Sequence, residues 1–301
     1  MTWQAVARKD FEDAIRSRWL WGLSVVFILV FSFPAFVRLY SGDLGGPQNN
    51  AGIVQLVIFF MKEATAIVVP LTAIVVAYAS ITRERGSGTM KLLLSLPHSR
   101  ADVVAGKLLG RSAVIAIPVL IGFLVSIVLL VPGSSAPDWL TYVQFAFLTA
   151  MLGVVFVGVS VGISAAANGD RQAILGSGGA FALFWFGWDF LSNRLVDGTI
   201  TILGDLGVDV ATATRYEVVL FLKLLNPIQS YKTLVDSLFM PALRARLQMF
   251  GFFLGVDPRA QEALGPSLSP IYGDAFVVVY MLAWLAIPIA LGLVAFRSAD
   301  L

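Results

Sequence analysis

Six long apolar stretches, almost free of charged residues, constrain this chain more than any other feature. A helix needs about 20 apolar residues to cross the hydrocarbon core of a bilayer. Of the 301 residues, 58% are hydrophobic and only 13% are charged, whereas about 25% are charged in ordinary soluble domains. The sequence therefore predicts an all-α integral membrane protein with six transmembrane helices, at Trp19–Tyr40, Ile53–Ile81, Ser112–Val131, Leu140–Ile163, Gln172–Leu191 and Ala275–Phe296.

The residue content excludes several classes of chemistry. The chain has no cysteine, one histidine and a net charge of +2, which excludes disulfides, thiol nucleophiles and multi-histidine metal sites and argues against nucleic acid as a partner. An intramembrane protease needs a histidine or two aspartates within the spans, but His98 lies in a connection and only Asp189 comes close. We therefore expect no catalytic residue, no metal site and no cofactor site in this chain.

The distribution of Lys and Arg predicts the orientation, because short cytoplasmic connections are enriched in both. Four precede the first span and six lie in 83–111, whereas 41–52 and 136–139 have none. Both termini and the 83–111 connection are thus expected in the cytoplasm. The segment Ser192–Asp274 is expected outside, although its length exempts it from the counting rule.

The rest of the chain is expected to belong to one transmembrane domain over 1–301. Residues 1–18 place Trp3, Ala7 and Phe11 on one helical face, a pattern typical of an amphipathic helix lying along the inner membrane surface. The extracytoplasmic segment 192–274 has apolar blocks interrupted by charged and proline residues, which predicts short helices and no further span.

The cytoplasmic connection 83–111 carries most of the functional information. Gly86 and Gly88 permit a sharp reversal, a leucine-rich helix follows over Thr89–Leu96, and Pro97 ends it. Ser99 and Asp102 have the spacing of a capping box at the start of the next helix. The leucine-rich helix needs an apolar partner, and the residues leave open whether this is the inner leaflet or a groove on a soluble protein.

The same residues resemble a known signature. Glu84 to Thr89 reads ERGSGT and Leu92 to Pro97 reads LLLSLP, followed by Arg100, Asp102 and Gly106-Lys107. This pattern of about 25 residues resembles the cytoplasmic signature of the ABC-2 family of ATP-binding-cassette transporter permeases, particularly its small NosY-like subunits. Six spans, an amphipathic N-terminal helix and Asn226-Pro227 before the last span extend the resemblance less specifically.

The resemblance implies a division of labour between two subunits. In the family, this connection is a coupling helix that docks on a separate ABC ATPase, which binds ATP and Mg²⁺. The chain itself has no P-loop, since Gly106-Lys107 is followed by Leu108. The expected protein is a homodimeric permease in a prokaryotic plasma membrane that exports its substrate without being an enzyme itself. The expected ATPase contacts are Glu84, Gly88, Thr89, Leu92, Leu93, Leu96 and Pro97.

Two further groups of residues have competing interpretations. Lys62 and Glu63 either face the transport pathway or dimer interface, or they lie at the outer surface of a span that begins near Ala64. Glycines in the fourth and fifth stretches are interpreted as close-packing positions between helices, at Gly158, Gly162 and Gly176.

Two other functions also remain open from the residues. A secondary transporter would likewise have many spans and no cofactor, but it should carry ionisable groups at mid-membrane. A subunit that transmits force to an envelope partner without transporting a substrate would have the same coupling helix. Association with an ATPase that depends on Leu92, Leu93 and Leu96 discriminates a coupled subunit from a secondary transporter.

Overall fold

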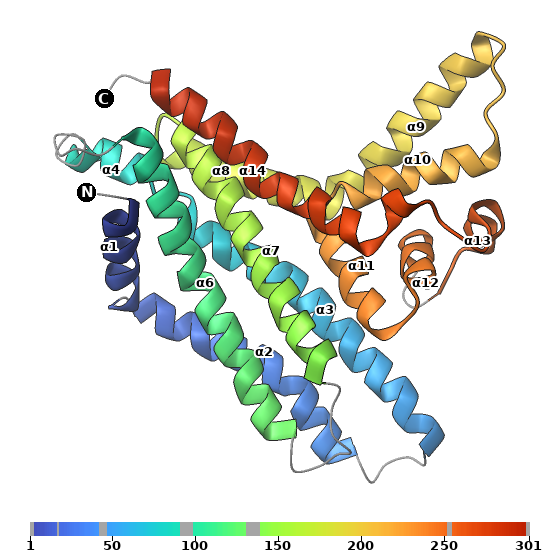
Figure 1. The fold of residues 1–301 in the computed structure, drawn as a ribbon, viewed down its shortest axis with the longest axis horizontal. Helices are drawn as coiled ribbons and strands as arrows, with labels where there is room; N and C mark the ends of the chain where they lie inside the picture. The colour runs from blue at the N-terminus through green and yellow to red at the C-terminus, as the bar shows by residue number, and fades with distance from the viewer. Residues whose placement is uncertain are drawn as a thin grey trace. The chain divides into compact units, whose positions relative to one another are not determined.

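The computed structural model describes residues 3–16, 18–41, 47–90, 99–130, 139–251 and 255–298, and these contain helices and turns but no strand. The chain divides into two compact units. The first unit is Met1–Gly178 with Trp284–Leu301, and the second is Gly179–Ala283. Helices α8 and α14, both labelled in Figure 1, contribute residues to both units.

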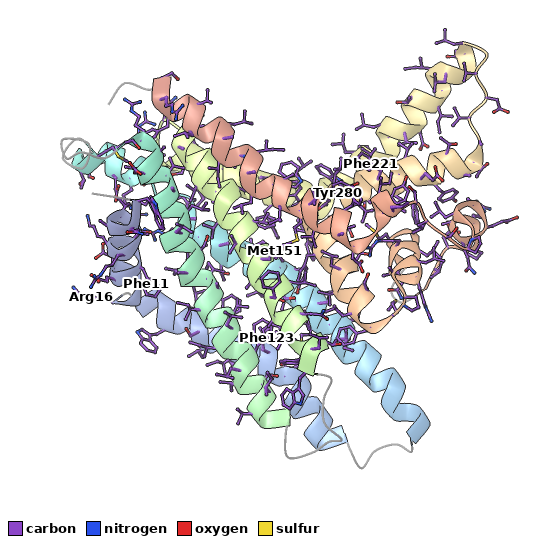
Figure 2. The ribbon with its side chains drawn as sticks, viewed as in Figure 1. Phe11, Arg16, Phe123, Met151, Phe221 and Tyr280 are labelled. Atoms are coloured by element: carbon purple, nitrogen blue, oxygen red, sulfur yellow. The ribbon has the colours of Figure 1, made fainter. Side chains whose placement is uncertain are left out.

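The first unit is a bundle of long helices around α6. Its elements are α1 (Trp3–Ile15), α2 (Arg18–Ser41), α3 (Pro47–Ala77), α4 (Thr82–Gly86), α6 (Arg100–Leu130), α7 (Trp139–Ala166), most of α8 (Asp170–Ala182) and the end of α14 (Asp274–Ser298). Helices α1, α2 and α7 all pack on α6. Phe123 of α6, labelled in Figure 2, lies 4.1 Å from the ring of Phe31 on α2 and 5.2 Å from that of Phe145 on α7.

Five helical stretches are long and apolar enough to cross a membrane: Ile58–Gly86, Arg100–Val128, Trp139–Ala166, Asp170–Asp205 and Asp274–Ser298. They correspond to five of the six predicted spans, which confirms the all-helical, multi-pass character. Helix α2 occupies the position of the first predicted span, and the apolar helix found within its described residues is Trp21–Phe33. The first predicted span, Trp19–Tyr40, therefore stays a prediction, and so does the total of six spans.

Prolines lie inside three of these helices without ending them. Pro70 is in α3, Pro118 in α6 and Pro288 in α14. Membrane helices tolerate such positions because neighbouring helices, hydroxyl side chains and waters can satisfy the freed backbone groups.

The second unit consists mainly of short helices. They are η2 (Leu183–Gly187, a π-helix), α9 (Trp188–Asp205), α10 (Thr212–Leu224), α11 (Pro227–Phe239), α12 (Ala242–Leu247), η3 (Gln248–Phe250), α13 (Pro258–Leu264) and η4 (Pro270–Tyr272). Figure 2 labels Phe221 and Tyr280, whose rings meet edge to face at 5.6 Å within this unit.

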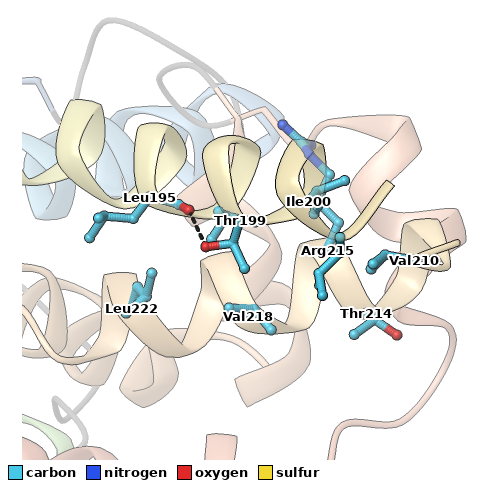
Figure 3. A pocket seen from close by; sticks show the side chains of 10 residues that line it. Leu195, Thr199, Ile200, Val210, Thr214, Arg215, Val218 and Leu222 are labelled. Atoms are coloured by element: carbon cyan, nitrogen blue, oxygen red, sulfur yellow. Dashed lines mark hydrogen bonds between the residues drawn. The ribbon is translucent and has the colours of Figure 1, made fainter. Parts of the chain in front are cut away.

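The structure differs from the sequence-based boundary at Leu191, because the helix continues through α9 to Asp205. Its apolar side chains Leu195 and Leu203 line a cavity of about 360 Å³ together with Val218 and Leu222 of α10. Figure 3 labels Leu195, Val218 and Leu222 at this cavity. The part of α9 beyond Leu191 therefore packs on α10, and the sequence pattern did not reveal this apolar partner.

Two buried polar side chains fix the second unit. The guanidinium of Arg246 is fully buried, donates to the carbonyl of Tyr272 at 3.0 Å and pairs with Asp274 at 2.5 Å. Asn226 accepts from the backbone N–H of Ile228 at 2.9 Å and donates to the carbonyl of Phe184 at 2.7 Å. Asn226 thereby caps α11 and holds it against the π-helix.

Candidate functional site

The candidate site is built around α4, the short helix that leads from the second predicted span into the 83–111 connection. The backbone N–H groups of Ile81 and Thr82 both donate to the hydroxyl of Ser164, at 3.2 and 3.3 Å. The Thr82 hydroxyl donates to the carboxylate of Asp170, and Arg85 donates to the carbonyl of Ala167 at 3.0 Å. These bonds attach α4 to the end of α7 and the start of α8.

A buried ion-pair network attaches α4 to α6 and α1. The Lys107 ammonium lies 2.8 Å from Asp10 Oδ1 and 2.6 Å from Glu84 Oε1. Arg111 Nε lies 2.7 Å from Asp10 Oδ2. Asp10 and Lys107 are only 4% and 5% exposed, and two cations balance two carboxylates here. Because unpaired buried charges are strongly destabilising, each member of this network depends on the others.

Two glycines allow α1 to approach α6 closely enough to form this network. A Cβ on Gly106 would lie 2.6 Å from Val6 Cβ, and a Cβ on Gly110 would lie 2.9 Å from Asp10 Cβ. Both distances are too short for real carbon atoms. The glycines flank Lys107 on α6, so the same short segment supplies the close approach and the buried charge.

The end of α14 completes the arrangement. The guanidiniums of Arg85 and Arg100 lie 6.0 and 5.3 Å from the ring centroid of Phe296. Arg100 also donates to the carbonyls of Phe296 and Arg297, the second at 3.0 Å. Cationic donors near a helix C-terminus satisfy its free carbonyls and complement its dipole. We name the whole arrangement of α4 with its partners on α1, α6, α7, α8 and α14 the α4 junction.

The turn and the helix start predicted around the connection are confirmed. Gly88 has a φ of 75°, in the left-handed region that favours glycine. The Ser99 N–H donates to Asp102 Oδ2 at 3.0 Å, and the Asp102 N–H donates to Ser99 Oγ at 3.1 Å. This reciprocal pair is a capping box with aspartate at the third position.

The expected ATPase contacts fall into two groups. Glu84, Gly88 and Thr89 are described, and all three are half-buried. The Glu84 carboxylate is directed at Lys107 within the chain, and the Thr89 hydroxyl lies 2.9 Å from that of Ser87. Leu92, Leu93, Leu96 and Pro97 lie outside the described residues.

Sequence reasoning missed Asp10, Lys107 and Arg111 as members of one network. Asp10 is close to the apolar face of the N-terminal helix, where a carboxylate needs a partner, and this was the one available signal. The pairing itself could not be read from the sequence, because 97 residues separate Lys107 from Asp10.

Lys62 and Glu63 lie within an unbroken helix, since α3 runs from Pro47 to Ala77. Lys62 is 5% exposed, and its ammonium lies 5.4 Å from the centroid of the Phe59 ring. Glu63 is half-buried. The helix is continuous through both residues, and Lys62 is enclosed by protein atoms. Whether the membrane span begins before Lys62 or near Ala64 stays a prediction.

The glycines of α7 face α14 in the first unit. A Cβ on Gly158 would overlap the side chain of Leu285, and a Cβ on Gly162 would overlap the backbone of Pro288. Gly292 in turn faces the backbone of Gly162. We name this contact the α7–α14 seam. Gly176 meets a neighbour on α7, where its Cβ would lie 2.8 Å from Ile163 Cγ2.

Comparison with known proteins was made on the whole sequence. The model of the "ABC-2 family transporter protein" family matches residues 4–301. The chain is 32% identical over 189 residues to the "Probable ABC transporter permease protein NosY" of Pseudomonas aeruginosa. It is 31% identical over 200 residues to the NosY protein of Stutzerimonas stutzeri and 27% identical over 139 residues to the "Probable ABC transporter permease YtrD" of Bacillus subtilis.

These alignments cover 60, 64 and 44% of this chain. They cover 65, 69 and 41% of the respective relatives, so the match to the Pseudomonas protein spans just under two thirds of its length. The family model, in contrast, covers nearly the whole chain and agrees with its multi-pass helical architecture. The chain therefore belongs to the ABC-2 family of transporter proteins.

Proposed function

We propose that this chain is the membrane-spanning permease subunit of an ABC transporter, driven by a separate ATPase subunit that binds ATP and Mg²⁺. The ATPase docks on the leucine-rich segment Thr89–Leu96. Two copies of the chain form a homodimer that exports its substrate across a prokaryotic plasma membrane. Both termini and the 83–111 connection lie in the cytoplasm, and six spans cross the bilayer.

The α4 junction is the observation that carries this proposal. A force applied to the segment after Gly88 acts directly on α4, and α4 is bonded through Glu84, Thr82 and Arg85 to other elements of the first unit. Packed side chains and ion pairs transmit small displacements because they rearrange between discrete states instead of deforming continuously. The junction is thus suited to convert closure of a partner ATPase into movement of several helices.

The homodimer follows from the small size of the helical bundle. A pathway enclosed by two symmetric copies needs fewer spans from each chain, and closed two-fold symmetry is the commonest arrangement of oligomers. Lys62 and Glu63 are assigned to that interface or pathway in this proposal, because charged groups within spans usually face a cavity or a partner.

The docking role is tested by Leu93→Asp in the full chain. The variant is expected to lose co-purification of the ATPase and the associated ATP hydrolysis from native membranes, because a carboxylate cannot enter an apolar groove unpaired. Leu206→Asp is the matched control, since Leu206 is 73% exposed at the end of α9 in the second unit. Retention of the ATPase by a membrane-inserted Leu93→Asp variant would contradict the proposal.

The orientation is tested separately, and the absence of cysteine makes the test clean. Single cysteines are introduced at Ser87 and at Asp209, both of which are exposed. A membrane-impermeant maleimide added to intact spheroplasts should label Asp209→Cys and leave Ser87→Cys unlabelled until the membrane is permeabilised. The opposite pattern would place the coupling segment outside and exclude an ATP-driven role.

A further inference from the structure

A cavity of about 630 Å³ opens beside the α4 junction in the first unit. Its walls come from α2, α3, α4 and α6, with Leu23, Leu71 and Val75 on the apolar part and Ser80, Arg83 and Glu84 on the polar part. Cavities of this size hold small ligands or parts of larger ones. A charged end next to an apolar wall favours an amphipathic ligand, with a polar group at one end and an apolar part at the other.

Among the described residues that line the polar end, Arg83 is the cation with the longest contacts to its partners. The side chain of Arg83 is 69% exposed and lies 3.8 Å from its carboxylate partner Asp170, a long ion pair. It donates to the hydroxyl of Tyr78 at 3.5 Å, also a long contact. The two other cations of the cavity, Lys107 and Arg111, are engaged by Asp10 and Glu84. Arg83 is therefore the guanidinium that can bind an anionic group there.

The same end contains polar atoms whose hydrogen bonds are incomplete. The hydroxyl of Ser80 is buried, with the residue 4% exposed, and has no hydrogen-bond partner among the described residues. Glu84 uses Oε1 for Lys107, whereas its buried Oε2 has no hydrogen-bond partner among them. Buried polar atoms normally have partners, so unsatisfied ones beside a cavity point to a missing ligand or water.

The apolar wall of the cavity includes side chains on the exposed surface of α3, which belongs to the second predicted span. Leu71 and Val75 line the cavity and are 42 and 58% exposed on α3. Exposed apolar side chains on a membrane helix face lipid chains, so the cavity opens towards the bilayer at the level where the span meets the charged connection. A ligand entering from this side is amphipathic, with its polar group at the Arg83 end.

We propose that this cavity binds the headgroup of a membrane phospholipid with an ammonium group, of the phosphatidylethanolamine type. The phosphate binds Arg83 and the hydroxyl of Tyr78, the ammonium is directed to the Glu84 carboxylate, and an acyl chain lies along Leu71 and Val75. The cavity holds a headgroup and glycerol but not two complete acyl chains. An overall negative headgroup fits less well, because Glu84 lines the cavity and Asp170 lies beside Arg83.

This inference goes beyond the proposed function and needs no ATPase. A bound lipid at this position contacts α3, α4 and α6 together, so it would act on the α4 junction from the membrane side. Binding is tested on the full chain alone, whereas the coupling role is tested with the ATPase, and either proposal can fail without the other.

The experiment measures lipids retained by the purified full chain. The protein is reconstituted into nanodiscs with equal mole fractions of phosphatidylethanolamine and phosphatidylglycerol, transferred to detergent and analysed by native mass spectrometry. Phosphatidylethanolamine adducts should predominate. Arg83→Gln should lower them about tenfold, as expected for the loss of one charge-assisted hydrogen bond.

Filling the cavity tests the location. Val75→Trp and Leu71→Trp should each abolish the adducts by occupying the apolar wall. Val128→Trp is the matched control, because Val128 is 64% exposed on α6 and does not line the cavity. Only variants with monodisperse size-exclusion profiles and unchanged unfolding temperatures are compared. The two filling variants and Arg83→Gln test the position of the lipid independently of one another.

Two results would overturn the proposal. Equal or preferred retention of phosphatidylglycerol would refute the role of Glu84 and the ammonium headgroup. Adducts that persist in Arg83→Gln and in the filling variants at the level of Val128→Trp would show that the lipid binds elsewhere on the protein.

Discussion

The α4 junction and the α7–α14 seam both hold helices of the first unit together, but by opposite means. In the junction, α1, α4 and α6 are connected by buried charges, with Lys107 between Asp10 and Glu84. In the seam, Gly158, Gly162 and Gly292 bring two helices so close that a Cβ would overlap the facing helix. The first contact depends on the matching of charges, and the second depends on the absence of side chains.

This difference determines what each contact can do during a conformational change. Ion pairs between long side chains can exchange partners while their charges stay compensated, as Lys107 and Arg111 already share Asp10. A glycine seam has no such alternative, because sliding by one residue brings larger side chains into the contact. We therefore expect the α4 junction to rearrange during the transport cycle while α7 and the part of α14 in the first unit move as one body.

The largest effect is expected from Lys107→Met. The change keeps the length of the side chain but removes the cation that pairs with Glu84, whereas Asp10 keeps Arg111. The uncompensated carboxylate should cost about 3 kcal/mol. The thermal unfolding of the purified protein in detergent measures it. The double variant Glu84→Gln with Lys107→Met should recover part of the loss, because the pair of Asp10 with Arg111 stays intact, and a lack of recovery would contradict the assignment to buried charge.

A smaller loss is expected from Gly162→Ala. The added methyl group overlaps the backbone of Pro288 and should separate α7 from α14 at a cost of about 2 kcal/mol. Gly178→Ala is the control, because nothing lies within 4 Å of its Cβ position and alanine favours a helix. If both variants unfold at the temperature of the parent protein, the seam does not depend on close approach.

Removal of the capping hydroxyl in Ser99→Ala should have a modest effect of about 1 kcal/mol. The Asp102 N–H loses its acceptor at 3.1 Å, and the first turn of α6 frays. Amide hydrogen exchange in residues 100–104 should increase, whereas exchange in α7 should not. Ser99→Thr keeps a hydroxyl and should preserve protection, so equal exchange in both variants would argue against the cap.

The smallest effect is expected at Arg8, which lies on α1 near the junction but on its exposed side. Arg8 Nε pairs with Glu12 at 2.7 Å, and this hydrogen bond raises the pKa of Arg8. Exposed pairs of this kind contribute little because water screens them. Arg8→Ala should leave the unfolding temperature unchanged, and a loss comparable with that of Lys107→Met would show that burial does not separate the two ion pairs.

The parts of the fold that follow from local pattern could be predicted. Apolar length located the five candidate spans found among the described residues, although α9 extends the fifth predicted span to Asp205. Ser99 and Asp102 located the start of α6 within one residue, because a capping box acts over a single turn. Gly88 marked the turn for the same reason, since its left-handed backbone is a local requirement.

The candidate site could be predicted only in part. The motif around Glu84 drew attention to the correct connection, but the direction of the Glu84 carboxylate, towards Lys107, depends on how α4 and α6 pack. Asp10 gave a weak signal, and Arg83 gave none that separated it from the other cations of the connection. Only the packed helices show that Arg83 stays exposed whereas Lys107 and Arg111 pair with carboxylates of other helices.

The sequence by itself determined that the chain lies in a membrane, where its long helices lie and which family it resembles. Apolar length, helix caps and a short motif are local properties of the chain, so they can be read without the tertiary structure. The tertiary structure decided which charges meet, where glycines replace side chains and where a cavity remains. Those features depend on residues far apart in the chain, such as Asp10 with Lys107 or Gly162 with Pro288, and their contact energies exist only once the helices have packed.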